Sequence, residues 1–177
     1  MREFARYLAD FAWFWPGVGI TLVAGIALGG RVGAALGLRR VAATLLLLGF
    51  GVIVSATLTP SREAIAFGAT GSGTCDLSRI GLAPLGQLIR FGDPSLNVFL
   101  YIPLGAAIGL ASRSRYRIAL AIGAAVLPFA IEATQLTVTW LDRACQSSDV
   151  SDNLTGLLVG GLIGWAVLFA LEGSGPP

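Results

Sequence analysis

The stretch IALAIGAAVLPFAIEATQLTVTWL, residues 118–141, indicates the class of protein, because its only charged side chain is that of Glu132. A helix needs about 20 mainly apolar residues to cross the roughly 30 Å of hydrocarbon in a bilayer. This stretch is long enough and apolar enough to do so. It therefore predicts a membrane-spanning helix that contains one carboxyl group.

Four other segments have a similar composition, and they are Phe11–Gly30, Val41–Pro60, Leu96–Ala111 and Leu154–Leu171. Together with Ile118–Leu141 they predict an all-α fold, a polytopic transmembrane helical bundle of about five spans that forms one domain over residues 1–177. Tryptophan favours the membrane interface, and the segment ends contain Trp13, Trp15, Trp140 and Trp165. The first segment is expected to remain as a span, because no convincing signal-peptide cleavage site follows it.

The composition of the chain agrees with a membrane protein. Hydrophobic residues make up 55% of its 177 residues and charged residues only 12%, whereas charged residues are about a quarter of a typical soluble protein. These values exclude a disordered chain and most soluble enzymes. All twelve basic residues are arginine, and the net charge is only +2. This charge is too small for a nucleic-acid-binding surface, so no nucleic acid partner is expected.

The sequence also gives no support to metal or cofactor chemistry. The chain has no histidine and only two cysteines. It therefore lacks the ligands of the usual zinc sites and the histidine of many general-base mechanisms. We expect neither a metal ion nor a cofactor.

Arginine is concentrated in two of the connections between the predicted spans. The arginines of the first and third connections are Arg31, Arg39, Arg40, Arg113, Arg115 and Arg117. Because cytoplasmic loops are enriched in basic residues, both connections are expected to be cytoplasmic. Five spans then place the N-terminus outside and the C-terminus inside, although Arg2 and Arg6 oppose this orientation.

The two cysteines fall in the connections on the opposite side. Cys75 lies in the second connection and Cys145 in the fourth. An oxidising exterior permits a disulfide, which would link these two loops. The alternative is two unpaired thiols, because a bridge requires the two Cα atoms to come within about 7 Å.

Glycine recurs at intervals of four residues in three of the predicted spans. These positions are Gly25, Gly29, Gly33 and Gly37, then Gly105 and Gly109, then Gly156, Gly160 and Gly164. Small residues at this spacing allow helix backbones to approach closely in a membrane. They predict packing stripes, either within one chain or between the copies of a homo-oligomer.

Glu132 is the most informative polar residue. An acidic residue near the centre of a span costs about 2.5–3.5 kcal/mol on insertion scales, and such residues usually face the bundle and have a partner. Gln135 shares its helical face, and Pro128 lies four residues earlier, where it predicts a kink. Glu132 is either part of a functional site or a hydrogen-bonded structural anchor.

A second polar group opens the fifth span. Asp149, Asn153, Gly156 and Gly160 are spaced so that they share one helical face. Asp149 is alternatively a helix cap, because its carboxylate suits the free N–H groups at a helix N-terminus. Arg143 precedes this group on the arginine-poor side, so it is not explained as a topology signal.

A third polar group lies in the third span. Asn97 and Tyr101 are four residues apart, so they share one face, and Pro103 interrupts a backbone hydrogen bond near them. The simpler interpretation makes Asn97 the N-terminal cap of this helix.

The order of these motifs resembles the VanZ-like family. The resemblance comes from Asn97-Val-Phe-Leu-Tyr-Ile-Pro-Leu-Gly105, Glu132-Ala-Thr-Gln135, Arg143 and Asp149-x-x-x-Asn153-x-x-Gly156, and it runs from about Leu82 to Gly164. Pro84 also resembles a proline that the family places before the first motif. Asp152 and the stretch between Arg143 and Ser148 depart from the usual pattern.

The resemblance implies a multi-pass protein of a bacterial plasma membrane, and the family is named for a protein of low-level teicoplanin resistance. The first hypothesis is a cell-envelope binding protein whose outward-facing pocket takes an anionic headgroup. A lipid-linked wall precursor and a glycopeptide are the ligands considered, and the lipid bilayer is the surrounding partner. The pocket residues expected are Asn97, Tyr101, Glu132, Gln135, Arg143, Asp149 and Asn153.

Other classes of function remain open at this point. An intramembrane lipid-headgroup enzyme would use Glu132 as a buried acid and Asp149 as an ionised base, although no nucleophile motif is present. A small proton-coupled transporter would use Glu132 as a proton relay, although no inverted repeat is visible. A purely structural subunit is the fourth class.

Overall fold

The computed structural model describes residues 13–88 and 92–173. Arg2, Arg6 and the first two residues of the predicted first span lie outside the described residues. In chain order the elements are α2 (Phe14–Leu36), α3 (Arg40–Thr57), α4 (Arg62–Phe67), β1 (Cys75–Asp76), α5 (Leu85–Leu88), α6 (Asp93–Leu110), α7 (Arg117–Thr137), the 3-10 helix η1 (Thr139–Leu141), β2 (Cys145–Gln146) and α8 (Ser147–Gly173).

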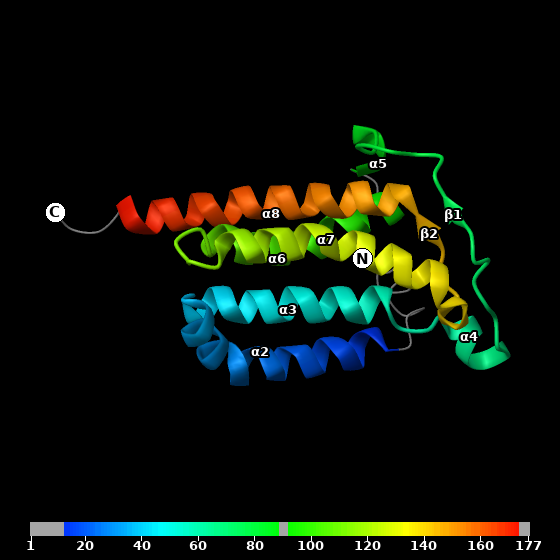
Figure 1. The fold of residues 1–177 in the computed structure, drawn as a ribbon, viewed down its shortest axis with the longest axis horizontal. Coiled ribbons are helices and arrows are strands. Elements are labelled where there is room, and N and C mark those ends of the chain that lie inside the picture. The colour runs from blue at the N-terminus through cyan, green and yellow to red at the C-terminus, as the bar shows by residue number, and fades with distance from the viewer. Residues whose placement is uncertain (1–12, 89–91, 174–177) are drawn as a thin grey trace.

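The all-α class and the bundle of about five spans are confirmed. Four described helices, α2, α3, α7 and α8, are long and apolar enough to cross a membrane, and α6 is a shorter apolar helix. They lie alongside one another (Figure 1). α2 packs against α3, α3 against α6, and α6 against α8, while α7 contacts both α6 and α8. The chain is thus a multi-pass membrane protein.

The side chains are distributed as in a bundle surrounded by lipid. The buried cluster consists of Ile53, Tyr101, Leu104, Ala124 and Ile131. Many large apolar side chains instead point outward, among them Ile20, Val23, Phe50, Ile122, Phe129, Leu162 and Phe169. An exposed apolar surface of this extent is expected when the surrounding medium is hydrocarbon.

The glycine stripes pack within the chain. A Cβ added at Gly105 or Gly109 on α6 would overlap the backbone of α8, and one at Gly160 or Gly164 on α8 would overlap the backbone of α6. The α6–α8 pair therefore depends on residues without side chains. On α2, Gly25, Gly29 and Gly33 are also buried, but a Cβ at Gly29 would overlap the Thr44 side chain of α3 and one at Gly33 the carbonyl of Leu38.

Gly37 differs from the rest of its stripe. It ends α2 with a left-handed backbone, φ 63° and ψ 39°, and its N–H donates to the carbonyl of Gly33. This conformation favours glycine because an L side chain is strained there.

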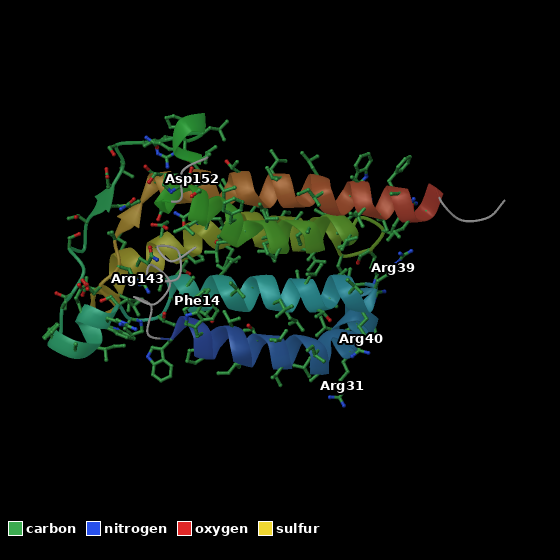
Figure 2. All side chains as sticks on the ribbon, turned by 180° about the vertical axis from the view of Figure 1, so that it is seen from behind. Phe14, Arg31, Arg39, Arg40, Arg143 and Asp152 are labelled. Atoms are coloured by element: carbon green, nitrogen blue, oxygen red, sulfur yellow. A yellow bond between two sulfur atoms is a disulfide. The ribbon has the colours of Figure 1, made fainter. Side chains whose placement is uncertain are left out.

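The two ends of the bundle differ. Arg31, Arg39 and Arg40 lie at one end, opposite Phe14, Arg143 and Asp152 (Figure 2). The connection between α6 and α7 lies with the first group, because Ser114 Oγ donates to the carbonyl of Leu36 at 2.6 Å. We call this the arginine end. As predicted, the first and third connections lie on the same side.

The opposite end contains a disulfide between Cys75 and Cys145, so we call it the disulfide end. The predicted bridge is thus present, with 4.5 Å between the two Cα atoms. The same residues pair across the short parallel ladder of β1 and β2. The second and fourth connections are therefore joined to each other beyond the helices.

Three predicted span boundaries are wrong. The first span ends at Leu36 rather than Gly30. The fourth span ends at Thr137 rather than Leu141, because η1 and the left-handed Asp142 (φ 52°) turn the chain back toward the bundle. The fifth span begins at Ser147 rather than Leu154. Its polar first two turns are helical because loop residues, rather than lipid, cover them.

Candidate functional site

Glu132 lies in the last two turns of α7, on a face that the fourth connection covers. Its carboxylate oxygen Oε2 accepts a hydrogen bond from the backbone N–H of Gln146 at 2.7 Å. Gln146 directly follows the disulfide-bonded Cys145. The connection between α7 and α8 thus returns to the bundle and supplies a donor to the intramembrane carboxylate.

Three further polar side chains are buried near this level of the bundle. Tyr101, Gln135 and Asn153, like Glu132, are less than a tenth exposed. Tyr101 and Glu132 are close enough for the carboxylate charge to act on the phenol. On α8, Gly156 packs against Val98 and Tyr101, which brings α8 against α6 one turn beyond Asn153. We call Tyr101, Glu132, Gln135 and Asn153 the buried polar cluster.

The buried polar cluster has unused hydrogen-bonding capacity. Gln135 Nε2 donates to the carbonyl of Thr57, at the end of α3, at 2.9 Å. Three buried atoms, Tyr101 Oη, Gln135 Oε1 and Asn153 Oδ1, have no hydrogen-bond partner within residues 13–88 and 92–173. Such buried unpaired atoms are rare in native proteins, and each needs an explanation.

An ion pair fixes the second connection to α8. Arg79 makes two hydrogen bonds to the carboxylate of Asp152, one of them 3.2 Å between Nη1 and Oδ1. The Asp152 side chain is 2% exposed and that of Arg79 is 28% exposed. The hydrogen bond to Asp152 raises the pKa of Arg79 above its usual value, so this guanidinium stays charged.

Further bonds close the second connection over the start of α8. Ser147 Oγ donates to the carbonyl of Arg79 at 2.8 Å, and the N–H of Gly81 donates to Ser151 Oγ at 3.0 Å. Polar residues at the start of α8 are thereby paired with loop groups. This pairing explains why α8 extends beyond its predicted start.

Arg143 links the connection between α7 and α8 to the segment after α3. Its Nε and Nη2 atoms both donate to the carbonyl of Thr59, at 3.0 and 2.9 Å. Nearby, Ser61 Oγ donates to Asp142 Oδ2 at 2.7 Å. Arg143 thus uses two N–H groups of its planar guanidinium, and both donate to a backbone carbonyl rather than to an anion.

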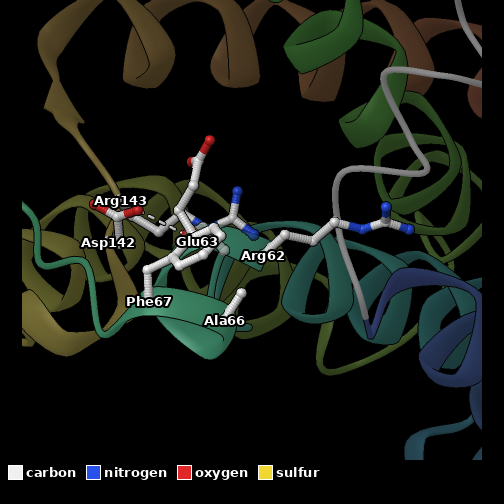
Figure 3. A pocket seen from close by; sticks show the side chains of 7 residues that line it. Arg62, Glu63, Ala66, Phe67, Asp142 and Arg143 are labelled. Carbon is white, nitrogen blue, oxygen red and sulfur yellow. Dashed lines mark hydrogen bonds between the residues drawn. The ribbon is translucent and has the colours of Figure 1, made fainter.

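An open pocket of about 550 Å³ lies beside Arg143 at the disulfide end. Its lining residues are Ser61, Arg62, Glu63, Ala66, Phe67, Asp142 and Arg143. Figure 3 shows Asp142 and Arg143 opposite α4, which supplies most of the other lining side chains. The lining thus includes two arginines, two acidic residues and one phenylalanine, and the Arg62 side chain extends away from Asp142 and Arg143 (Figure 3). We call this open pocket the surface pocket.

The predicted site residues are thus divided between two places. Tyr101, Glu132, Gln135 and Asn153 lie in the buried polar cluster, and Arg143 lines the surface pocket. Asp149 lies in the first turn of α8 and interacts electrostatically with Glu132. Asn97 is half-buried inside α6, so it does not cap that helix, which begins at Asp93.

The predicted prolines and glycines take their expected positions on helices. Pro103 and Pro128 lie inside α6 and α7, which continue past them. Pro128 is buried, whereas Pro103 faces outward.

Sequence reasoning missed Arg79, Asp152 and the surface residues Arg62, Glu63 and Phe67. Asp152 seemed a departure from the family pattern, yet it is among the most buried polar residues described. A signal was available: Asp152 is an acidic residue near the start of an apolar helix, and Arg79 is an isolated cation on the arginine-poor side.

Comparison with known proteins identifies the family. A family model described as VanZ/LLP1 matches residues 46–170, which is well over half of the chain. No curated protein and no solved structure matches. The match confirms the resemblance inferred from the motifs between Asn97 and Gly156.

Proposed function

Because the chain belongs to the VanZ/LLP1 family, we propose that it binds an anionic headgroup of the bacterial cell envelope at its disulfide end. The ligand is a lipid-linked wall precursor or a glycopeptide, and its binding modulates susceptibility to teicoplanin. The observation that supports this function most directly is the surface pocket, which combines Arg62 and Arg143 with Phe67.

The orientation follows from the distribution of charge. The arginine end contains the two arginine-rich connections, α2–α3 and α6–α7. Basic connections favour the cytoplasmic side of a membrane. The disulfide end then faces the oxidising exterior, where a structural disulfide persists. The surface pocket would open toward the outer face of the plasma membrane, where wall precursors and glycopeptides meet.

The chemistry of the surface pocket suits a headgroup of mixed charge. An exposed guanidinium at Arg62 is available to a phosphate or carboxylate, which Arg binds through paired N–H groups. Glu63 and Asp142 suit the amino groups of a peptide. Phe67 is 85% exposed and offers an apolar face beside them.

Binding to the purified protein in nanodiscs tests this function. Labelled wall-precursor lipid and teicoplanin are titrated against the wild type, Arg62→Ala and Arg113→Ala. Arg62→Ala should weaken binding of the ligand about fivefold to tenfold, as loss of one exposed charge-assisted contact predicts. Arg113→Ala removes an arginine from the other end and should bind as the wild type does. An unchanged Kd in Arg62→Ala would count against the surface pocket.

One observation favours a second candidate, an intramembrane lipid-headgroup enzyme. Glu132 is buried, Asp149 is half-buried, and the two carboxylates interact electrostatically. Two carboxyl groups in unlike environments are the usual arrangement for an acid and a base. Phosphate release from labelled lipids, lost in Asp149→Asn, would establish this activity in place of binding alone.

A further inference from the structure

We propose that the buried polar cluster of Tyr101, Glu132, Gln135 and Asn153 binds a small monovalent cation, either a metal ion such as Na⁺ or the ammonium group of a lipid headgroup. This inference goes beyond headgroup binding in the surface pocket and does not depend on it. It rests on the unpaired atoms of the cluster, on their chemical type and on the charge beside them.

The unpaired atoms are oxygens that can accept. Gln135 Nε2 donates to the carbonyl of Thr57, and a carbonyl only accepts, so the orientation of this amide is fixed and Oε1 is the atom without a partner. Asn153 Oδ1 is a second amide oxygen, and Tyr101 Oη also has acceptor capacity. Two of the three unpaired atoms, the amide oxygens of Gln135 and Asn153, can therefore only accept, whereas the Tyr101 hydroxyl can donate or accept, so the two amide oxygens lack a donor or a positive charge.

The charge of the cluster points the same way. Glu132 contributes a carboxyl group, and the charge acting on it from α8 is that of Asp149, a second carboxylate. Its recorded hydrogen-bond donor is the neutral N–H of Gln146. An anion would be repelled here, whereas a cation would be attracted by the carboxylate and could be bound by the carboxylate and the amide oxygens together.

The elements that meet at the cluster resemble those of cation sites in other membrane proteins. The residues of the cluster belong to α6, α7 and α8, which pack against one another, and α3 ends at Thr57, whose carbonyl accepts from Gln135. Na⁺ sites within transporters use backbone carbonyls and the C-terminal ends of helices, and the C-terminal end of α3 lies at Thr57. A water molecule is the simpler occupant, but it offers two donors and no charge to three oxygens and a carboxyl group.

The first test is thermal unfolding of the full-length protein in nanodiscs of phosphatidylglycerol, followed by the fluorescence of its tryptophans. NaCl, LiCl and KCl are titrated at constant ionic strength against N-methylglucamine chloride. A bound metal ion stabilises the folded state, so Tm should rise along a saturable curve with one of the metal ions. A second series adds phosphatidylethanolamine to the nanodiscs without alkali metal ions.

The two series distinguish the source of the cation. A rise with a metal ion supports a metal site, and a rise with phosphatidylethanolamine alone supports an ammonium site. Identical Tm values in every medium would overturn the proposal and leave water as the occupant.

Two variants locate the site, with a matched control. Glu132→Gln removes the charge with little change of shape and should weaken the apparent cation affinity at least roughly tenfold. The control, Glu172→Gln, neutralises the partner of Arg113 at the arginine end and should keep the wild-type response. A full response in Glu132→Gln would overturn the proposal.

Tyr101→Phe is tested both without and with the cation, because the substitution should affect the unfolding temperature differently in the two cases. Without the cation, this variant should unfold at the wild-type temperature or above it, because it lacks a buried hydroxyl without a partner. With the cation it should gain less than the wild type. An equal gain would contradict the proposed set of ligands. Headgroup binding at the surface pocket, measured in the same variants, separates failure of the cation site from failure of the proposed function.

Discussion

The two ends of this bundle are built by different means. At the arginine end, residues 37–39 and 111–116 suffice to connect the helices, and glycines such as Gly109 and Gly164 bring backbones into direct contact. At the disulfide end, residues 58–88 and 138–146 belong to longer connections. The disulfide links these two connections, and the Arg79–Asp152 ion pair links the first of them to α8. The arginine end is held together mainly by close helix packing. The disulfide end has a fixed surface and buried polar groups, as a binding site requires.

The largest expected effect concerns the side of the membrane on which each end lies. A reporter enzyme that is active only outside the cell should be inactive when fused after Arg115 and active when fused near Gly73. The two fusions should differ almost completely, because each loop lies wholly on one side. The reverse pattern would show that the ends are assigned to the wrong sides.

The next largest effect concerns the ion pairs at the two ends, whose loss should lower the free energy of unfolding by different amounts. Arg79→Ala leaves Asp152, 2% exposed, without its partner, and removal of one partner of a buried pair costs about 3–5 kcal/mol. Arg113→Ala breaks a pair with Glu172 in which the arginine is 76% exposed, and such exposed pairs contribute about 0–1 kcal/mol. Denaturant unfolding in detergent measures both. Equal losses would remove the energetic distinction between the ends.

The disulfide should contribute somewhat less to the free energy of unfolding than the Arg79–Asp152 ion pair does. Replacing Cys75 and Cys145 together by serine should lower the free energy of unfolding by about 2–4 kcal/mol, because the bridge restricts the unfolded chain. In intact cells, a membrane-impermeant thiol reagent should label the native protein only after reduction. Labelling of either cysteine without reduction would contradict the bridge.

The smallest expected effect concerns the glycines. Gly109→Ala places a methyl group against the backbone of α8, and overpacking of this kind costs about 1–3 kcal/mol. Gly123→Ala is the matched control, because nothing lies within 4 Å of the position of its added methyl group. The control should be neutral or slightly stabilising. A neutral Gly109→Ala would show that α6 and α8 separate more easily than the structure indicates.

The spans were predictable because each is long, apolar and separated from the next by polar residues. Arginine density predicted the membrane side of each connection, and that prediction in turn favoured a bridge between the two cysteines, which the structure contains. The glycine spacing predicted stripes, but it did not distinguish contacts within the chain from contacts between chains. Only the packing of Gly105 against α8 resolved this.

The site was less predictable because its geometry depends on loops. Residues of α7 such as Glu132 and Gln135 share a face by helical period alone, so their proximity was foreseeable. The bond from Gln146 to Glu132 depends on the left-handed turn at Asp142, and the pairing of Arg79 with Asp152 joins residues 73 positions apart. Local periodicity carries no information on such contacts.

The most direct test of a binding site at the disulfide end is photo-crosslinking in living cells. Benzoylphenylalanine is introduced at Phe67 in the surface pocket, or at Ile118, which is 64% exposed at the start of α7 near the arginine end. After irradiation, molecules joined to the protein are identified by mass. The account predicts capture of a wall-precursor lipid, or of teicoplanin in cells treated with it, from position 67 and of neither from position 118. No capture from position 67, or equal capture from both positions, would contradict it.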